Sequence, residues 1–585
     1  MKIYTTIFIL LLFSLATHGQ NRSISGVVLD QKSEVISSVK VILRPSGRVT
    51  YTNSRGEFSF SGISHNDNEL YFSSIGYWEK VFMIESSKGF QQIQIVMSQK
   101  QHVLQEVLVA ESSIKQRKAN ESMSLEIVDQ AFITRNLGGS LMATLSRLPG
   151  VKTIGIGSGQ SKPLVRGLGF NRVVVVDKGI KHEGQQWGAD HGLEIDQFAA
   201  REVELLKGAA SFMYGSDAIA GVINVLPFGA PQAGTSGGSV DLIGKTNNGL
   251  YGTSVNLFGR RDKWFADGRV TYQNYGDYTV PTDRVFVYDY AVDLHKNKLR
   301  NTAGRENAIH LNTGYVGKSF QSTFYMSNVF NKSGFFANAH GLEPRRVDTD
   351  LHDASSRDIL MPSQQVNHFK ISNKSTLEIE NHLLELEAGY QHNFRQEFNH
   401  YVNHGYMPAI YPDTMSIPID LEREYDKKVY SANIRDRIVS GSHTVTAGLN
   451  GEYQDNKIGG WTFLVPAFKQ ATLGAFVYDQ FRLNPRVLLH GALRYDYSSN
   501  RMQEYRDWFE SPIEDGSGDR ERVVRAQALT RTFQSFVWSA GINYDLEDLQ
   551  LKANIGKSFR VTITKEFGAN GINYHYFSYE KGDPN

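Results

Sequence analysis

Apolar and polar residues alternate with a period of two over much of the chain, most regularly beyond about residue 229. Within 489–497, one side of the predicted strand carries Leu489, Gly491, Leu493, Tyr495 and Tyr497. The pattern returns in 535–545 and 549–555, and the short turn Leu546–Asp548 predicts that these two segments form a hairpin. Repeated alternation over about ten residues is typical of transmembrane β-strands, which turn an apolar side to lipid. We expect about 12 to 15 such strands.

The first part of the chain, residues 22–98, shows shorter runs of β-type residues separated by glycine and asparagine. The runs are Ile24–Leu29, Val39–Leu43, Glu57–Phe60, Glu69–Phe72 and Ile93–Met97. Short strands at this spacing predict a small β-sandwich.

Between these two parts the pattern is mixed α/β. Leu141, Leu145 and Leu148 predict a short amphipathic helix that Pro149 and Gly150 end, and Val173–Val176 predicts a strand. The segment Arg201–Val225 is rich in glycine and alanine, yet its apolar residues alternate as in two half-buried strands. Its glycines at 208, 215 and 221 permit a tight backbone path between the two strands.

The N-terminus predicts export. Lys2 precedes the apolar run Ile7–Leu15, and small residues follow, as in a secretory signal peptide cleaved after Gly19. This run is too short to cross a bilayer as a helix, and no later segment offers about 18 consecutive apolar residues. A membrane span must therefore be a closed β-barrel, which together with export predicts the outer membrane of a Gram-negative bacterium.

Composition removes several classes of function. Lys and Arg total 62 against 61 Asp and Glu, so no net field attracts nucleic acid. The absence of cysteine excludes disulfides, thiolate catalysis and thiolate zinc sites. The 28 tyrosines and 33 phenylalanines suit the aromatic girdles of a membrane barrel, although an aromatic-rich secreted β protein would share them.

Two segments resemble enzyme motifs but lack an essential residue. HEGQQ at 182–186 has Gln186 where a zinc protease needs its second histidine. GIGSGQSK at 155–162 lacks the order of a phosphate-binding loop, and we expect a flexible loop there. The sequence shows no nucleophile, base and acid at a hydrolytic spacing, so we expect that the protein is not an enzyme.

Four blocks resemble the plug of the TonB-dependent outer-membrane receptors and follow that family's order. They are LPGV at 148–151, LVRG at 164–167, RVVVVDKG at 172–179 and the segment 201–225. SGVVLD at Ser25, NSRGEFSF at Asn53 and SSIGYWEKV at Ser73 resemble the carboxypeptidase regulatory-like domain of Bacteroidetes-type receptors. The resemblance implies a mainly β fold. Its expected order is signal peptide 1–19, β-sandwich 20–98, linker 99–121, α/β plug 122–228 and transmembrane antiparallel β-barrel 229–585.

The linker contains LQEVLVAES at Leu104–Ser112, an extended apolar segment that resembles a TonB box. By this resemblance it would pair with a periplasmic partner, the TonB–ExbB–ExbD complex, through β-strand addition. The partner-binding residues would be Leu104, Glu106, Val107, Leu108 and Val109. The alternative is an ordinary linking strand packed on the sandwich or the plug.

The polar segment Gly184–Asp196 holds the candidate metal site. Asp190 and His191 offer a carboxylate oxygen and an imidazole nitrogen, a pair suited to Zn²⁺ and similar divalent ions. WGADHGLEID resembles the plug of the zinc-uptake branch of the family, which implies that Asp190 and His191 bind metal. In the alternative interpretation Asp190 caps a turn and His191 hydrogen-bonds a neighbouring loop.

A long polar segment, 337–368, is predicted to be a barrel loop and contains His340, Glu343, His352, Asp353 and His368. Since Zn²⁺ usually takes about four ligands, two residues of the plug would need two more. His340 and Glu343 are favoured because they lie three residues apart at an expected loop tip. The alternative is a solvated polar loop without bound metal.

These observations predict an importer of a scarce divalent metal, zinc before copper, or of a metal chelate. A siderophore, haem or cobalamin receptor is the alternative within transport. The family's barrel has about twenty-two strands, more than the alternation predicts here, and the chain stops at a turn-like sequence. We therefore expect a C-terminally truncated barrel. The alternative outside transport is a receptor relic that binds a partner at the cell surface and does not transport.

Overall fold

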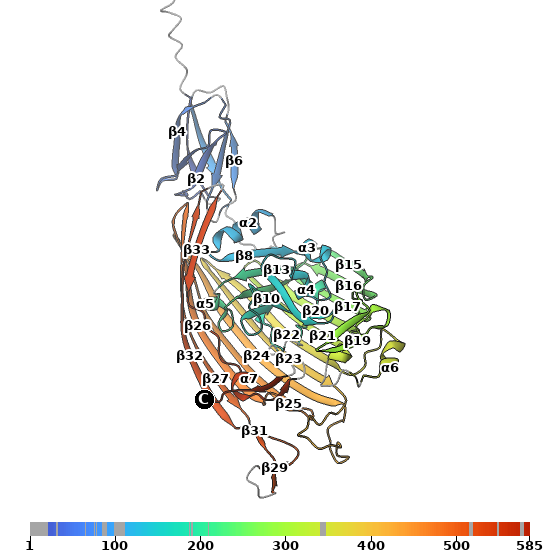
Figure 1. The fold of residues 1–585 in the computed structure, drawn as a ribbon. Helices are drawn as coiled ribbons and strands as arrows, with labels where there is room; N and C mark the ends of the chain where they lie inside the picture. Colours follow the sequence, from blue (N-terminus) through green and yellow to red (C-terminus); the bar gives the residue numbers. More distant parts are fainter. Residues whose placement is uncertain are drawn as a thin grey trace, which may run out of the picture. The chain divides into compact units, whose positions relative to one another are not determined.

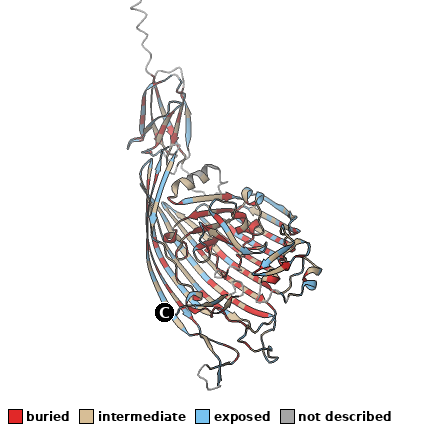
Figure 2. Ribbon diagram, viewed as in Figure 1, coloured by how far each residue is buried: buried red, intermediate tan, exposed pale blue. Residues whose placement is uncertain are grey.

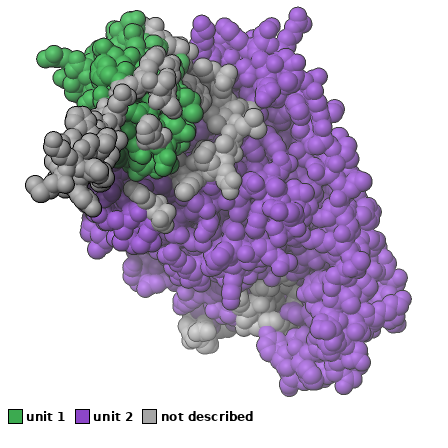
Figure 3. All heavy atoms as spheres, turned by 90° about the horizontal axis from the view of Figure 1, so that it is seen from above, with its two compact units in different colours: residues 1–105 green, residues 106–585 purple. Residues whose placement is uncertain are grey.

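The computed structural model describes residues 22–585 apart from a set of short gaps (Figure 1). The gaps are 31–32, 65, 75–76, 78, 85–89, 99–110, 186–187, 189–190, 209, 340–344, 346, 514–518, 547–548 and 574–577. The signal peptide predicted over 1–19 lies outside the described residues. The chain divides into two compact units, residues 1–105 and 106–585, which Figure 3 distinguishes by colour.

The first unit is a β-sandwich, as predicted. Its strands are β1 (Arg22–Leu29), β2 (Lys40–Arg44), β3 (Arg48–Tyr51), β4 (Glu57–Ile63), β5 (Glu69–Ser73), β6 (Lys80–Met83) and β7 (Phe90–Val96). One sheet has the order β4-β1-β7 and the other β3-β2-β5-β6. Buried residues such as Ile24, Val41, Phe58 and Phe72 form the core. Strands β3 and β6 were not predicted, because they are short edge strands whose residues are mostly exposed and show no buried face.

The second unit begins with the mixed α/β region that we call the plug. It comprises α2 (Glu111–Asn120), β8 (Ser124–Asp129), α3 (Gln130–Arg135), α4 (Leu141–Leu145), β9 (Val151–Ile156), β10 (Gln160–Val165), β11 (Val173–Asp177), β12 (Ile180–Lys181), η1 (Gln197–Ala199), β13 (Ala200–Lys207), α5 (Ser211–Tyr214) and β14 (Gly221–Pro227). Five of the strands form one sheet in the order β12-β11-β14-β13-β8. The predicted helix before Pro149 is α4, whose N-cap Ser140 accepts from Ala143 N at 3.3 Å.

The glycine-rich segment folds as predicted into two strands, β13 and β14, with the single turn of α5 between them. They pair antiparallel from Lys207 opposite Gly221 onward. Gly221 has φ +155°, and a Cβ there would lie 2.2 Å from the carbonyl oxygen of Leu206. Only glycine allows the chain to return this closely beside β13.

Two expectations about the plug are corrected. Residues 155–162 do not form a flexible loop, because β9 and β10 pair as an antiparallel hairpin. In this hairpin Gln160, Ser161 and Lys162 are buried although they are polar. The alternation of apolar and polar residues that usually identifies a strand is therefore absent from the sequence. The last two residues of the predicted extended segment, Glu111 and Ser112, begin helix α2. The predicted partner-binding residues Leu104, Glu106, Val107, Leu108 and Val109 all lie outside the described residues.

The rest of the second unit is built on one antiparallel sheet, in which the described residues form thirteen strands. In sheet order these are β15 (Ser236–Lys245), β16 (Leu250–Arg261), β17 (Trp264–Tyr275), β20 (Gly304–Val316), β21 (Phe320–Gly334), β22 (Ser363–Ile379), β23 (His382–Phe398), β24 (Leu421–Ser440), β25 (His443–Gly459), β26 (Phe468–Asn484), β27 (Val487–Met502), β32 (Leu529–Asp545) and β33 (Gln550–Gly556). The predicted hairpin is confirmed, since β32 pairs antiparallel with β33.

Exposed and buried residues alternate along these strands (Figure 2). In β27, Leu493 and Tyr495 are exposed while Arg494 and Asp496 are buried, as the sequence pattern predicts. The plug lies on the concave side of the sheet (Figure 1), where the ring of Phe212 in α5 lies 5.2 Å from that of Tyr478 in β26. Buried polar residues of the strands therefore face the plug.

The two ends of the sheet differ. At one end the strands join through short turns, for instance 262–263, 317–319 and 380–381. At the other end β15 and β16 join through 246–249, and the following strands join through longer connections. These carry β18 (Arg284–Val287), β19 (Tyr290–Asp293), η2 (His295–Asn297), η3 (Ala337–Ala339), α6 (Thr349–Ala354), β28 (Tyr505–Arg506), β29 (Ser511–Pro512), β30 (Arg520–Glu521) and β31 (Val524–Ala526). After β33 the chain adds α7 (Thr564–Gly568), β34 (Asn570–Asn573) and β35 (Ser578–Lys581).

The loop predicted over 337–368 is shorter than expected. It contains η3 and α6, but β22 begins at Ser363, so His368 lies on a strand. On the buried side of β22 the polar residues His368 and Lys370 contact the plug, and the polar run at the start of this strand resembles a loop in sequence. Across the described part of the chain, no helix has both the length and the apolar character needed to cross a membrane.

Candidate functional site

The plug segment between β12 and η1, residues 182–196, buries several polar side chains. Its described residues include six buried polar or charged side chains: His182, Glu183, Gln185, His191, Glu194 and Asp196. The ammonium group of Lys162 in β10 holds the segment's backbone, since its Nζ donates to Gln185 O at 3.0 Å and to Gly188 O at 2.8 Å. The barrel strands β20 to β25 supply most of the other partners.

Three side chains form a compact set that we call the histidine–glutamate cluster: His182, Glu194 and His368. One ligand atom of each lies within 4.8 Å of the others, and all three residues are buried. Glu194 Oε2 lies 3.4 Å from His368 Nδ1 and 3.9 Å from His182 Nε2, and the two imidazole rings stack at 4.5 Å. Two ligands of a tetrahedral Zn²⁺ are separated by about 3.3 Å, because each bond is about 2.0–2.1 Å long. The spacing of Glu194 and His368 is thus close to that of two ligands, while His182 Nε2 lies about 0.6 Å too far from Glu194.

Cationic side chains surround the cluster. Arg395 Nη2 lies 3.1 Å from Glu194 Oε1, and Lys370 Nζ lies 3.1 Å from His182 Nδ1 and 2.7 Å from Asp177 Oδ2. Because an ammonium group can only donate, His182 Nδ1 accepts this hydrogen bond. Glu194 is therefore already neutralised by Arg395, and a metal ion would have to displace that guanidinium.

The same contacts explain the titration of the two plug residues. Burial, reinforced by the charge of Lys370, holds the pKa of His182 well below its ordinary value. Burial alone would raise the pKa of Glu194, but the hydrogen bond from His368 and the charge of Arg395 lower it. Because Nδ1 of the neutral His182 ring accepts from Lys370, the proton lies on Nε2, the nitrogen that faces Glu194. A metal ion bound there would require Lys370 to move and the proton to shift to Nδ1.

His191, a predicted metal ligand, is also buried between plug and barrel. Its Nδ1 lies 2.9 Å from Gln185 O and its Nε2 lies 2.9 Å from Glu397 Oε1. The carboxylate of Glu397 is shared with Arg423, whose Nε lies 3.1 Å from Oε2. An imidazole nitrogen and a carboxylate oxygen thus face each other, about 0.4 Å closer than two ligands of one tetrahedral zinc ion.

The other predicted ligands, Asp190, His340 and Glu343, lie outside the described residues. Of the remaining polar residues in the predicted loop, His352 lies in α6 and Asp353 pairs with Arg300 at 2.7 Å. Sequence analysis missed Glu194 as a cluster member and Glu397 as the partner of His191, and it set His182 aside with the protease motif. Alternation could have placed Glu397 on the buried side of its strand, but not opposite His191.

A second polar contact lies beside the cluster. Asp196 Oδ2 accepts from Thr271 Oγ1 at 2.7 Å and lies 3.1 Å from His310 Nε2, while Lys178 Nζ lies 3.1 Å from His310 Nδ1. The cavity between this contact and the cluster has a volume of about 10 Å³ and is lined by residues of both. It offers room for about one water molecule. Between the described residues of this contact and the cluster, the cavity is too small for a bulky ligand.

Comparisons with known proteins agree with this architecture. A family model described as CarboxypepD_reg-like domain matches residues 24–109, the TonB-dependent Receptor Plug Domain matches 117–222, and the TonB dependent receptor-like, beta-barrel model matches 227–585. The last of these spans more than half of the chain.

Among curated relatives, the chain is similar to vitamin B12 transporters named BtuB. It is 29% identical to that of Photobacterium profundum over 146 residues, 25% of this chain and 24% of the relative. It is 33% identical to that of Vibrio cholerae serotype O1 (strain ATCC 39315 / El Tor Inaba N16961) over 125 residues, 21% of this chain and 20% of the relative. The matched part is about a quarter of these relatives' length or less.

Solved structures share the fold at low sequence identity. The copper transporter OprC aligns with a TM-score of 0.58 at 13% identity, covering 76% of this chain and 64% of that one. The Serratia marcescens hemophore receptor HasR aligns with a TM-score of 0.60 at 13% identity, covering 80% and 68%. Domain order, the plug inside an antiparallel sheet and the family matches together show that this chain belongs to the TonB-dependent receptors of the outer membrane, a family of receptors and transporters.

Proposed function

We propose that this receptor imports a scarce divalent metal ion across the outer membrane, zinc before copper, or a small chelate of such a metal. The observation that carries the proposal is the histidine–glutamate cluster. There one ligand atom from each of two imidazoles and one carboxylate lies within 4.8 Å of the others. Imidazole and carboxylate are both common ligands of Zn²⁺. The residues lie between plug and barrel, where a substrate must pass.

His191 and Asp190 would capture the ion first, with His340 and Glu343 of the following barrel loop as further ligands. The ion would then move to the histidine–glutamate cluster as Arg395 releases Glu194. Energy would come from the TonB–ExbB–ExbD complex pulling on the segment that contains Leu104, Glu106, Val107, Leu108 and Val109. The pull would loosen the plug, whose contacts with the barrel are mainly polar and exchangeable.

A cobalamin receptor is the second candidate, favoured by the similarity to the BtuB relatives. A bulky ligand of that kind would need aromatic side chains presented to the outside. In the long connections Trp461 and Phe509 are buried together with Met407. Phe286 and Tyr288 of the connection between β17 and β20 are exposed and could contact such a ligand. The preference for the metal proposal therefore rests on the histidine–glutamate cluster alone.

Calorimetric titration of the purified chain with Zn²⁺ tests the proposal. We expect that Asp190→Ala with His191→Ala, and separately His182→Ala with His368→Ala, each weakens zinc binding at least about tenfold, the effect of about 1.4 kcal/mol. His443→Ala is the matched control, because His443 pairs with Asp479 at 2.7 Å on the exposed side of the sheet, away from the plug.

Unchanged zinc affinity in both double variants would refute the metal site. Uptake gives the second measurement: a strain lacking this receptor should grow poorly under zinc limitation and recover with the wild-type gene. Recovery by cobalamin or by a siderophore, and not by zinc, would assign the receptor to the second candidate class.

A further inference from the structure

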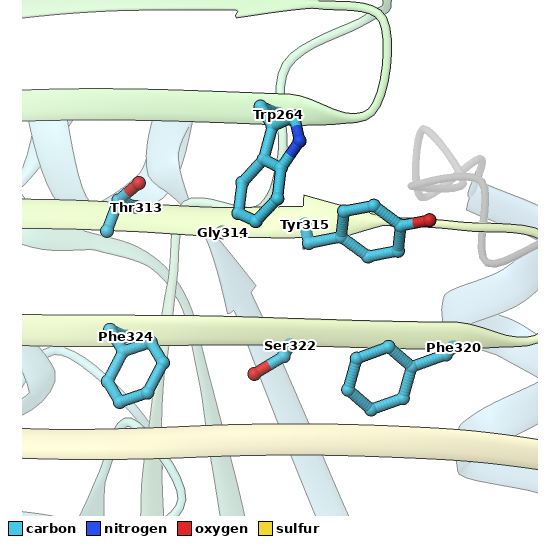
Figure 4. Close-up of a pocket in the computed structure, with 7 residues that line it drawn as sticks. All are labelled: Trp264, Thr313, Gly314, Tyr315, Phe320, Ser322 and Phe324. Carbon is cyan, nitrogen blue, oxygen red and sulfur yellow. The ribbon is translucent and has the colours of Figure 1, made fainter.

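The outward side of the barrel sheet carries a groove near the short-turn end (Figure 4). It has a volume of about 520 Å³ and is lined by Trp264, Thr313, Gly314, Tyr315, Phe320, Ser322 and Phe324. This volume lies in the range of about 300–1,000 Å³ that is usual for small-molecule pockets. The groove lies on the face that turns to lipid and takes no part in the contacts between plug and barrel.

The strand register explains the shape of the groove. Trp264 of β17 pairs with Tyr315 of β20, and Tyr315 pairs with Ser322 of β21. Across these three strands an indole and a phenol therefore lie next to a small side chain. In the next row the small residue Thr313 pairs with Phe324. Figure 4 shows Ser322 between the rings of Phe320 and Phe324. The aromatic rings form walls around a floor of small side chains.

One lining residue of this groove, Ser322, belongs to a small polar group on the lipid-facing surface. Asn373 Nδ2 donates to Ser322 Oγ at 3.0 Å, and Ser375 Oγ lies 2.9 Å from Ser322 Oγ. Asn373 and Ser375 share the outward side of β22 with Ile371 and Leu377, because side chains alternate along a strand. The outward side of a barrel strand is otherwise apolar through the membrane. These three side chains hydrogen-bond one another, and Ser322 Oγ accepts in both of its bonds, so its own O–H can donate to a ligand in the groove.

The depth of these residues matches the ester region of a bilayer. Ser322 lies two residues from the start of β21, and Ser375 lies four residues from the end of β22. At about 3.4 Å per residue and a tilt of about 40°, they lie roughly 5–10 Å from the short-turn end. Short turns of outer-membrane barrels face the periplasm, so this end lies in the inner leaflet.

Basic side chains line the rim of the groove at the turn. Lys263 is exposed, and its Nζ lies 5.8 Å from the centroid of the Tyr315 ring. A second groove of about 620 Å³ shares Trp264 and Thr313 with the first and adds Arg260 and Arg261. Positive charge at headgroup level, hydroxyl and amide groups at ester level and aromatic walls below are the recognition elements of an anionic amphiphile.

We propose that this groove is a specific binding site for a glycerophospholipid of the inner leaflet. The phosphate contacts Lys263 and Arg261, an ester oxygen accepts from the hydroxyl of Ser322, and one acyl chain crosses Thr313 between the rings of Trp264 and Phe324. The site is independent of the metal proposal. It would hold the barrel wall at a fixed depth and orientation in the membrane.

Native mass spectrometry of the full chain in detergent tests the site, with phosphatidylglycerol and a diacylglycerol of the same chains as probes. We expect the wild type to retain one phosphatidylglycerol in preference to the diacylglycerol. Thr313→Trp, which fills the groove, should lower this retention about tenfold, and Ile309→Trp on the same outward side of β20 should not. Arg261→Gln with Lys263→Gln should lower retention of phosphatidylglycerol about tenfold and leave diacylglycerol unchanged, whereas Arg486→Gln in another short turn should have no effect.

Several results would overturn the proposal. Equal retention in Thr313→Trp and Ile309→Trp would mean that lipid does not occupy the groove. Equal binding of the two probes to the wild type would mean that the phosphate is not recognised. A dimer that Thr313→Trp abolishes without any change in lipid retention would assign the groove to a second copy of the chain. Ser322→Leu, a smaller change on the groove floor, gives a second variant should Thr313→Trp fail to fold, and its unchanged retention would also refute the site.

Discussion

Replacing Arg395 by methionine removes the charge that compensates Glu194 at the centre of the site. The two side chains lie 3.1 Å apart and are 1% and 4% exposed, so almost no solvent screens them. At an effective dielectric constant of about 20 their attraction is about 5 kcal/mol. Removing one partner of a buried pair costs about 3–5 kcal/mol, because the other charge stays buried without compensation. We expect the segment 182–196 to become easier to open by this amount.

Hydrogen exchange followed by mass spectrometry measures this opening directly. A cost of about 3–5 kcal/mol lowers the protection of peptides from 182–196 by between about a hundredfold and a few thousandfold. Peptides from β27 serve as the internal reference within the same molecules. Arg269→Met is the matched control, because Arg269 is equally buried but pairs with Asp241 within the barrel sheet.

A double variant separates the charge effect from lost packing. Glu194→Gln combined with Arg395→Met leaves neither charge unpaired, so protection should return to within about 1–2 kcal/mol of the wild type, with a coupling of about 2–3 kcal/mol. A double variant no better protected than Arg395→Met would refute the reasoning. The same single variant should bind Zn²⁺ more tightly than the wild type, since the competing guanidinium is gone.

Two further predictions concern the plug. Because the pKa of His182 is lower in the folded chain than the ordinary value of 6.5, the opened segment takes up a proton more readily, and the free energy of opening should fall by up to about 1.4 kcal/mol per pH unit below 6.5. Exchange measured at pH 7.5 and 5.5 checks this, and an identical pH dependence in His182→Gln would contradict it. Gly221→Ala should destabilise the β13–β14 contact by more than about 1 kcal/mol, because its φ is +155° and the new Cβ would meet Leu206 O at 2.2 Å. Gly491→Ala, where nothing lies within 4 Å, should leave thermal stability unchanged, and equal melting temperatures of the two variants would refute the steric argument.

Periodicity predicted the parts of the fold in which one side of an element is apolar. The strands β27 and β32 turn Leu493 and Trp538 outward, so the period of two is plain in the sequence. The α4 helix likewise has one buried apolar stripe and a stop at Pro149. Such elements can be recognised without knowing their neighbours.

Elements at the contact between plug and barrel were harder to predict, because there the usual contrast between buried apolar and exposed polar residues is absent. The plug hairpin that contains Gln160–Lys162 and the barrel strand β22 both bury polar residues at this contact, and both resemble loops in sequence. The pairing of His191 with Glu397 depends on which of the barrel strands faces the plug segment. That choice follows from strand tilt and register, which no local pattern contains.

The contacts of the plug segment also decide when it can form during assembly. Its partners stand far along the chain: Arg395 lies 201 residues beyond Glu194, Lys427 lies 244 beyond Glu183, and Asn456 lies 271 beyond Gln185. Contacts of such long range form late, since large stretches of chain must first be ordered. The segment therefore stays hydrated in the periplasm until β22 to β25 have come together around it. Its charges are buried only in a correctly registered wall, so a misassembled barrel exposes a loose, protease-sensitive plug.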